Sequence, residues 1–389
     1  MTLDQCCEIV SGATPKTSAK EYWDGDICWT TPKDLSNLET HYLEDTPRKI
    51  TKLGLDSCGA SILPSGSVLF SSRAPIGHVA INAVPMATNQ GFKSFIPKTG
   101  ILDAKFLFHW LRKNRDYLES LGNGATFKEV SKATVSRIEI TFPAIANQRR
   151  IAAILDQADA LRAKRREALT QLDSLTQSIF MEMFGDPATN PMSWPVRTIE
   201  QLCKVKGGKR LPKGADYSVS PTPFRYVRVT DMKSGKVDES NLHYLTPEVQ
   251  RTISRYIVNT GDVIISIAGS IGVIATVSNS LNGANLTENA AKLVARTQTD
   301  YISDFLAFML RTKAIQSQIE SHVGQVTIGK LALFRIEKLL MPLPPLQLQK
   351  TFATRIQAVE GLKDLHRTAL QELDALFASL QHRAFQGEL

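Results

Sequence analysis

The sequence predicts an α+β fold in which two similar globular domains are separated by two long helices. The helices are expected to form an antiparallel coiled coil, which gives the chain an internal pseudo-two-fold repeat. Three observations predict this fold. The second half of the chain repeats the first. Short strand-like runs alternate with Gly and Pro inside each half. Each half ends in a long segment with a heptad pattern of apolar residues.

The repeat is visible in segments that match in the same order along the two halves. They are "WTTPKDL" at 29–35 with "YVRVTDM" at 226–232, "GSVLFSSRAPIGHVAI" at 66–81 with "GDVIISIAGSIGVIAT" at 261–276, "RIEI" at 137 with "RIEK" at 335, and "ALTQLDSLTQSIF" at 168–180 with "ALQELDALFASLQ" at 369–381. The first pair aligns Asp34 with Asp231. We therefore expect a first domain at 1–146, a central helix at 147–186, a second domain at 187–345 and a C-terminal helix at 346–389.

Within the globular domains the strand and helix signals are mixed. Apolar runs bounded by turn residues predict strands at 68–70, 79–81, 226–230, 263–267 and 273–277. One amphipathic helix is expected in each domain, near 103–120 and 302–321. Strands and helices in one domain without a regular βαβ alternation indicate an α+β arrangement.

The two long segments place the same kinds of residue at their heptad a and d positions. We predict a helix-pair interface of Ile151, Ile154, Leu161, Leu172, Leu175, Ile179, Phe352, Val359, Leu362, Leu373, Leu376 and Leu380. Each segment has one polar residue at the same central a position, Arg165 or His366, which is typical of a residue that fixes register. The alternative is that each helix packs only on its own domain, which favours a wider apolar stripe than this seam.

Charge and cysteine content narrow the possible function classes. The net charge is +8, and the excess lies between residues 187 and 345, where 19 basic residues stand against 12 acidic ones. This excess favours a polyanionic partner, although a mildly basic protein without a nucleic-acid role has the same composition. Five cysteines without metal-ligand spacing favour a reducing, cytoplasmic location. The most apolar run, at 263–277, is too short to span a bilayer, so no membrane partner is expected.

The layout and several motifs resemble the specificity (S) subunit of type I restriction–modification systems. "SGATPKTSAKEYWDGDICWTTPKDL" at 11–35 is similar to the start of one target-recognition domain of that family, and "KGGKRLPKGADY" at 206–217 is similar to the start of a second. "RIEI", followed by a proline and "NQRRIAAILD", is similar to a segment that the family shares. The resemblance covers almost the whole chain.

The resemblance implies a DNA-recognition and assembly protein without catalytic activity. Each recognition domain would read one half of a split double-stranded DNA target, and the helices would set the gap between the halves. Two methyltransferase (M) subunits would dock on the helices and use S-adenosylmethionine to methylate adenine N6. Restriction (R) subunits would use ATP and Mg for cleavage, so this chain would need no cofactor of its own.

The residues themselves give no catalytic or metal site. No G-x-x-x-x-G-K-[ST] phosphate loop, H-E-x-x-H pair or G-x-S-x-G elbow occurs. "NPMSW" at 190–194 lacks the second proline and aromatic residue of an adenine-binding tetrapeptide. Catalytic and metal-binding residues are therefore expected to be absent. The rival functions are a single-chain methyltransferase or nuclease, and a structural protein that dimerises through coiled coils without DNA.

Positions that differ within a matched frame are candidates for reading different half-sites. Arg73 aligns with Ala268, and Arg228 aligns with Thr31; strand alternation predicts an exposed Arg228. Arginine is the commonest direct reader of guanine, although a solvated surface arginine is the commoner case. The other DNA-binding candidates are basic residues suited to phosphate contact, namely Lys16, Lys20, Lys33, Lys128, Lys206, Lys209, Arg210 and Lys213. The run Arg162, Lys164, Arg165 and Arg166 on the central helix could face M subunits or DNA.

Overall fold

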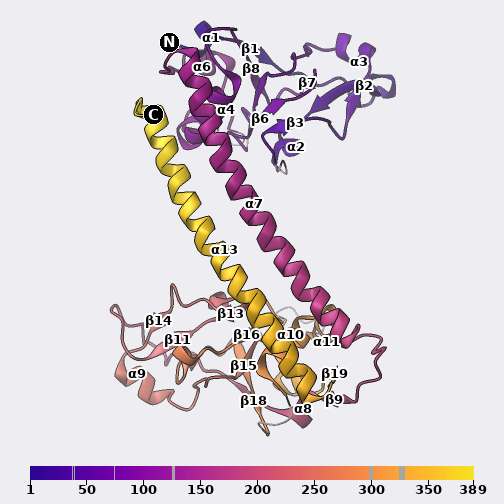
Figure 1. Ribbon diagram of the computed structural model, residues 1–389, viewed down its shortest axis with the longest axis vertical. Coiled ribbons are helices and arrows are strands. Elements are labelled where there is room, and N and C mark those ends of the chain that lie inside the picture. The colour runs from indigo at the N-terminus through magenta and orange to yellow at the C-terminus, as the bar shows by residue number, and fades with distance from the viewer. Residues whose placement is uncertain (37, 39, 74, 125–127, 298–300, 324–328) are drawn as a thin grey trace. The chain divides into compact units, whose positions relative to one another are not determined.

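The computed structural model describes residues 1–389 except 37, 39, 74, 125–127, 298–300 and 324–328. The chain forms two compact units (Figure 1). The first unit contains Met1–Glu167 and His366–Leu389, and the second contains Ala168–Leu365. Each unit therefore contains one globular domain together with part of both long helices. No helix in the described ranges is long and apolar enough to cross a membrane.

The first unit is built on a five-stranded sheet and a smaller three-stranded sheet. The larger sheet has the order β1 (Cys7–Ser11), β8 (Lys93–Pro97), β5 (Val68–Phe70), β6 (Val79–Asn82) and β3 (Tyr42–Leu43). The smaller sheet has the order β4 (Lys49–Ile50), β2 (Trp23–Thr30) and β7 (Ala87–Thr88). The short helices are α1 (Leu3–Cys6), α2 (Pro32–Ser36), α3 (Lys52–Asp56), α4 (Ala104–Lys113), α5 (Arg115–Ser120) and α6 (Lys132–Ser136).

The second unit repeats this plan on a six-stranded sheet. Its order is β10 (Cys203–Gly207), β18 (Ala290–Ala295), β15 (Val263–Ser266), β16 (Ile274–Thr276), β13 (Gly235–Val237) and β12 (Met232–Lys233). Two small sheets join β14 (His243–Tyr244), β11 (Arg225–Val227) and β17 (Asn285–Leu286), and β19 (Leu340–Pro342) with β9 (Val196–Thr198). The short helices are α8 (Ile199–Leu202), α9 (Pro247–Thr252), α10 (Ser303–Arg311), α11 (Lys313–Val323) and α12 (Leu333–Glu337).

The helix predicted in each domain has one apolar face, and in the first domain its start is also capped by a side chain. In α4 the carboxylate of Asp103 accepts hydrogen bonds from the backbone N–H groups of Lys105 and Phe106 at 3.0 and 3.1 Å. Phe106 and Leu111 are fully buried in the core of the first unit. The structure divides each predicted helix into two, α4 with α5 and α10 with α11. Asn114 takes a non-helical conformation at the first break, and Thr312 an extended one at the second.

A buried glutamine joins each long helix to the globular domain before it. The long helices are α7 (Ile145–Phe184) and α13 (Leu346–Gln386). Near the start of α7, the side-chain oxygen of Gln148 accepts from Asp103 N–H at 2.8 Å, and its amide donates to Ile101 O and Pro143 O at 2.9 Å. In α13, Gln349 accepts from Ile302 N–H at 2.9 Å and donates to Pro344 O at 2.9 Å. Both glutamines are fully buried, so these hydrogen bonds fix where each helix begins.

The two long helices are antiparallel in each unit. In the first unit Arg162 of α7 donates to Asp374 of α13 at 2.5 Å, and Arg165 contacts His366 at 3.2 Å. As the residue number rises in α7 it falls in α13, and Figure 1 shows the end of α13 beside the start of α7. In the second unit Lys363 pairs with Asp173 at 2.8 Å. Together with the repeated α+β units, these contacts confirm the predicted fold class.

The heptad prediction is wrong for four of the leucines in the helix-pair interface. Leu161, Leu175, Leu362 and Leu376 are 52%, 44%, 49% and 51% exposed. Ile151, Phe352 and Val359 are buried, and the other predicted positions, Ile154, Leu172, Ile179, Leu373 and Leu380, are half-buried.

In the middle part of each long helix, the buried positions come one residue after the predicted heptad a and d positions. This buried face carries Leu155, Asp159, Thr176 and Phe180 on α7, and Lys363 and Phe377 on α13. The helices pack on their own domains as well as on each other, so the apolar stripe is wider than a coiled-coil seam. The leucine pattern misses this face because ion pairs, rather than leucines, fill its centre.

Phe180 is expected to contribute far more to stability than Leu175 on the same helix. Phe180 is 1% exposed, and its ring centroid lies 4.8 Å from Phe308 and 5.6 Å from Phe352. Phe180→Ala should lower the free energy of unfolding of the second unit by about 3–5 kcal/mol, because it leaves a cavity. Leu175→Ala is the matched control and should change it by less than about 1 kcal/mol. Urea unfolding of the full chain measures both, and equal effects would contradict the observed interface.

Candidate nucleic-acid interface

A basic segment in the second unit has a fixed backbone and exposed side chains. Lys206 lies in β10, and Lys209, Arg210 and Lys213 follow in the next loop; all four are exposed. Gly208 N–H donates to Ala290 O at 3.0 Å, and Lys209 N–H to Leu286 O at 2.8 Å. A Cβ at Gly208 would lie 2.1 Å from Thr287 O, so only glycine fits this close approach. The segment presents several cations from a rigid base, as phosphate contacts require.

Arg228 does not match its prediction as an exposed reader of bases. It follows β11 and begins a 3₁₀ turn (Val229–Asp231), so strand alternation ends before it. Its guanidinium donates to both carboxylate oxygens of Asp231, at 2.7 and 3.1 Å, and to Asn241 O at 3.2 Å. Asp231 also accepts from the backbone N–H of Arg228 at 2.8 Å, just as Asp34 accepts from Thr31 N–H at 2.7 Å in the first unit. Both units therefore have the same aspartate-capped turn, and in the second unit the guanidinium of Arg228 stabilises it.

The short helix α12 adds exposed residues that the sequence comparison missed. Lys330, Phe334 and Lys338 are exposed, and α12 packs against β10 through Leu333, whose side chain lies over Gly207. The alignment of "RIEI" at 137 with "RIEK" at 335 is wrong by three residues. Helix α6 ends at Ser136 and α12 ends at Glu337, so the structural equivalent of Arg137 is Lys338. An offset of 201, the same as between the long helices, would have placed Phe334 opposite Ala133.

In the first unit Arg73 forms a β-bridge with Glu129, the residue that follows Lys128. Arg73 Nε donates to Glu129 at 2.7 Å, and Lys93 Nζ lies 3.2 Å from the other oxygen of that carboxylate. Burial alone would raise the pKa of Glu129, but the hydrogen bonds from Arg73 and Lys93 outweigh it and lower that pKa. The side chain of Arg73 remains 45% exposed, and Lys128 is exposed beside it. Arg73 is therefore held in one direction while still open to solvent.

The other candidates of the first unit lie elsewhere. Lys16, Lys20 and Lys33 are exposed. The backbone carbonyl of Lys16 accepts from Trp23 Nε1 at 3.3 Å, and Lys33 lies in α2. Arg48, which the sequence comparison did not single out, lies 3.8 Å from the centre of the Trp23 ring. A cation on an aromatic ring is a local pattern that spacing along the chain does not predict.

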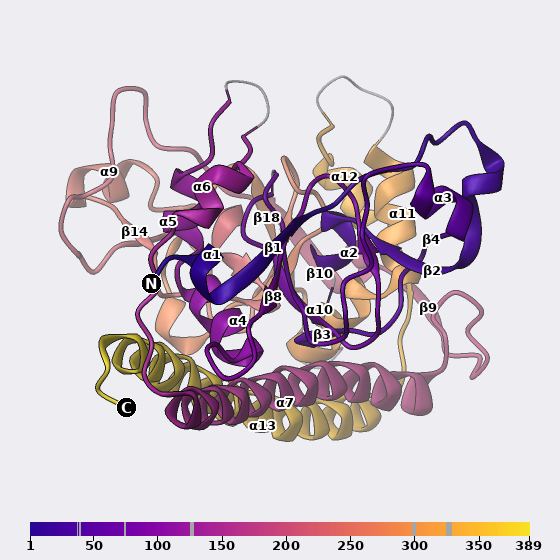
Figure 2. The same cartoon turned by 90° about the horizontal axis from the view of Figure 1, so that it is seen from above.

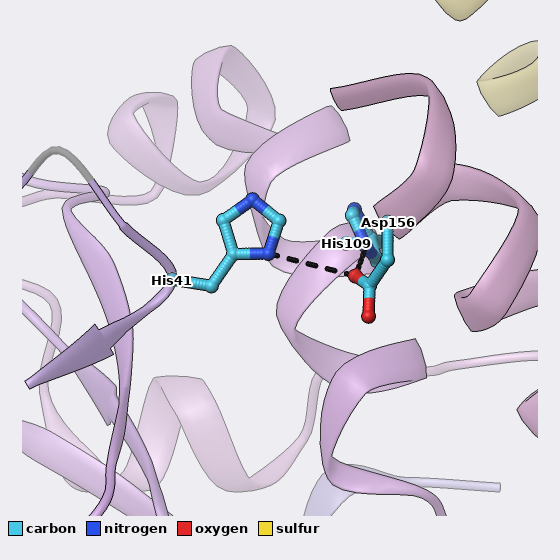
Figure 3. A group of neighbouring side chains, drawn as sticks. All are labelled: His41, His109 and Asp156. Carbon is cyan, nitrogen blue, oxygen red and sulfur yellow. Dashed lines mark hydrogen bonds and ion pairs between the residues drawn. The ribbon is translucent and has the colours of Figure 1, made fainter. Parts of the chain in front are cut away.

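A group of histidines and aspartates joins the first domain to α7. His41 and His109 both point at Asp156 (Figure 3). His109 Nε2 lies 2.8 Å and His41 Nδ1 3.5 Å from the same oxygen of Asp156. These three residues offer metal-ligand atoms within 4.8 Å of one another. Their residue types therefore make them a candidate metal centre.

The surrounding charges favour an ion-pair cluster over a metal centre. Lys105 lies 2.7 Å from Asp156, and His41, Arg112 and Arg162 lie 2.8, 2.7 and 2.5 Å from Asp159. Burial raises the pKa of both carboxyl groups, but hydrogen bonds from these cations and histidines outweigh it and hold both pKa values well below the ordinary range. A divalent cation would add charge to a site where lysine and arginine already balance the carboxylates.

The second unit has the same arrangement with different residues. Glu360 of α13 lies 201 positions after Asp159 and pairs with Lys236 at 3.2 Å and Lys363 at 2.9 Å. Lys363 corresponds in the same way to Arg162. An acidic residue on each long helix thus binds one cation from the same helix and one from the domain. We name this arrangement the acid clamp, formed by Asp159 in the first unit and Glu360 in the second.

Removing the acid of the first clamp should destabilise the first unit in a pH-dependent way. Asp159→Asn should lower the free energy of unfolding by about 2 kcal/mol at pH 7, because charged hydrogen bonds are lost. The lowered pKa of Asp159 makes this stabilisation present above the ordinary aspartate pKa of about 4 and lost as pH falls further. Urea unfolding at pH 7 and pH 3 tests this. Asp56→Asn, which breaks an exposed pair with Lys52, is the control and should cost less than about 0.5 kcal/mol. A wild-type advantage that stays constant with pH would contradict the clamp.

Comparisons with known proteins agree with this architecture. The family model for the type I restriction modification DNA specificity domain matches residues 1–171 and again 191–375. The type I restriction enzyme MjaIX specificity subunit of Methanocaldococcus jannaschii is 28% identical over 373 residues, which cover 90% of this chain and 84% of that protein. The EcoBI specificity subunit of Escherichia coli is 22% identical over 73% of this chain and 65% of its own length.

Solved structures share the fold. The S subunit of a type I restriction–modification system from M. genitalium superposes with a TM-score of 0.63 at 16% identity, covering 99% of this chain and 95% of that one. A chain from a structure of type I complex assembly gives a TM-score of 0.56 at 18% identity, covering 100% and 97%. The chain thus belongs to the family of type I restriction–modification DNA specificity domains, and it carries two copies of that domain.

Proposed function

We propose that this chain is the DNA specificity subunit of a type I restriction–modification complex and that each unit reads one half of a split double-stranded target. The observation that carries this proposal is one scaffold built twice with different exposed side chains. Asp34 and Asp231 brace the same turn in the two units. Ser71 and Ser266 close the next matched turn through hydroxyl bonds to Pro75 O and Ser270 O. Two residues beyond these serines, the first unit has Arg73 and the second has Ala268.

The long helices also expose apolar side chains on which partner subunits can dock. Leu161, Leu175, Leu362, Leu365 and Leu376 are 44–69% exposed on α7 and α13. Exposed leucines on a helix are available to a protein partner. We propose that two methyltransferase subunits dock on these helices and that restriction subunits join them. The antiparallel pairing within each unit supports the idea that the helices also set the gap between the half-sites.

The proposal leaves the chemistry to the partner subunits. S-adenosylmethionine, ATP and Mg would bind there, and this chain would supply the DNA sequence contacts. All five cysteines are free thiols, which suits the reducing cytoplasm in which we place the complex.

A map of N6-methyladenine tests the proposed function. In cells that express this chain with its methyltransferase subunit, we expect methylation at a split motif with two defined halves and a fixed gap. Cells with the methyltransferase alone are the control and should lack that motif. A fully assembled, active complex that methylates no split motif would contradict the proposal.

The basic segment of the second unit should bind phosphates rather than bases. Lys209→Ala with Arg210→Ala should weaken DNA binding of the assembled complex at every sequence, because phosphate contacts do not read bases. The slope of log affinity against log salt should fall by about 2, since two cations are removed. Lys350→Ala removes an exposed lysine from α13 and should leave the slope unchanged. A slope that stays at the wild-type value in the double variant would remove this segment from the DNA interface.

A further inference from the structure

Phe334 is the only exposed phenylalanine among the residues that the structure describes. Its side chain is 55% exposed, whereas phenylalanine is usually buried because its large apolar surface is stabilised away from water. The exposure has a structural cause. Leu331 and Ile336 are fully buried in the core of the second unit, and Leu333 packs on Gly207. These three residues fix the short helix α12, so the ring of Phe334 cannot turn inward without unpacking it.

Cations surround the exposed ring. Lys338 Nζ lies 5.6 Å and Arg335 Cζ 5.9 Å from the centre of the Phe334 ring. Lys330, just before α12, is exposed and forms a β-bridge with Ala268. The basic segment begins on the strand that α12 covers, since Leu333 touches Gly207 beside Lys206. The acid on α12 is Glu337, which is half-buried. An apolar ring in a cationic frame matches a duplex, which has phosphates on its rim and apolar base surfaces inside its grooves.

The first unit has the same frame with different chemistry. A β-bridge joins Arg73 to Glu129 there, and the corresponding bridge in the second unit joins Ala268 to Lys330. Ala133 occupies the position of Phe334, because α6 and α12 differ by 201 residues at both ends. The first unit thus offers an oriented guanidinium where the second has Ala268, and the second offers an apolar ring where the first has Ala133. This contrast is what two different half-sites would require.

We propose that Phe334 reads the second half-site through apolar contact with its bases, while Lys330 and Lys338 hold the flanking phosphates. This inference rests on the proposed function and deepens it. Phenylalanine contacts the methyl group of thymine or enters a base step as a wedge, and both are apolar contacts with bases. Figure 2 shows α12 on the side of the second unit away from α13. The ring therefore stays accessible when a protein partner covers that helix.

The experiment uses the complete chain assembled with its methyltransferase subunit. Phe334→Ala should weaken binding to the split target sequence about tenfold, because the variant loses the apolar contact with the bases. The methylation motif should relax at one or two positions of the second half only. Binding to unrelated DNA should stay unchanged, and Phe334→Leu should retain part of the affinity. Lys338→Ala should weaken binding to all sequences and lower the salt slope by about 1.

One control variant and one further readout make the test specific. Val219→Ala changes a fully exposed apolar residue elsewhere in the second unit and should have wild-type affinity and motif. Fluorescence of 2-aminopurine placed through the second half-site separates the two modes of contact. A rise that Phe334→Ala abolishes indicates a wedge, and specific binding without any rise indicates a methyl contact.

Three results would overturn the inference in different ways. Wild-type affinity and an unchanged motif for Phe334→Ala would overturn it and leave the proposed function standing. Loss of complex assembly by Phe334→Ala, seen by size-exclusion chromatography, would also overturn it, because the ring would then be a subunit contact. Absence of a split motif for the wild-type complex would overturn the proposed function and this inference together.

Discussion

The arrangement of each unit depends on a buried amide at the start of its long helix. Gln148 and Gln349 have no exposed surface, and each accepts a backbone N–H at the start of the domain helix and donates to a proline carbonyl before the long helix. A buried amide left without these partners would cost the full desolvation of its polar atoms. The bonds therefore allow one direction for the long helix, and the apolar core of the unit and the acid clamp form along it.

Apolar packing and the acid clamp both stabilise the contact between a domain and its long helix, in different ways. Apolar packing around Phe180 and Phe352 supplies non-directional stabilisation. The charged groups around Asp159 and Glu360 add direction, because each carboxylate must meet cations from two elements. With the interior of the two units so alike, the exposed side chains of the same frame can differ freely. This freedom is the physical basis on which one scaffold would read the two proposed half-sites.

Much of this architecture could be predicted from the sequence, since repeats and long heptad segments are properties of residue order. The interface between the helices could not, because Asp159 and Lys363 occupy buried positions that a search for leucines assigns to solvent. The prediction for Arg228 is wrong for a related reason. A turn capped by Asp231 interrupts the strand pattern, and the guanidinium of Arg228 donates its hydrogen bonds to that carboxylate. Phe334 was missed because "RIEI" and "RIEK" resemble each other more than the structurally equivalent residues do. The exposure of Arg73 and its contact with Glu129 also require the fold, since 56 residues separate the pair.

Exchange of one recognition domain tests most directly whether the two units read DNA independently. Residues 187–345 would be replaced by the second domain of a relative, and N6-methyladenine would be mapped in cells that express the hybrid with its methyltransferase. The account predicts that one half of the motif changes to that of the relative while the other half is retained. A motif that changes in both halves, from a hybrid that assembles normally, would contradict the claim that each unit reads its own half-site.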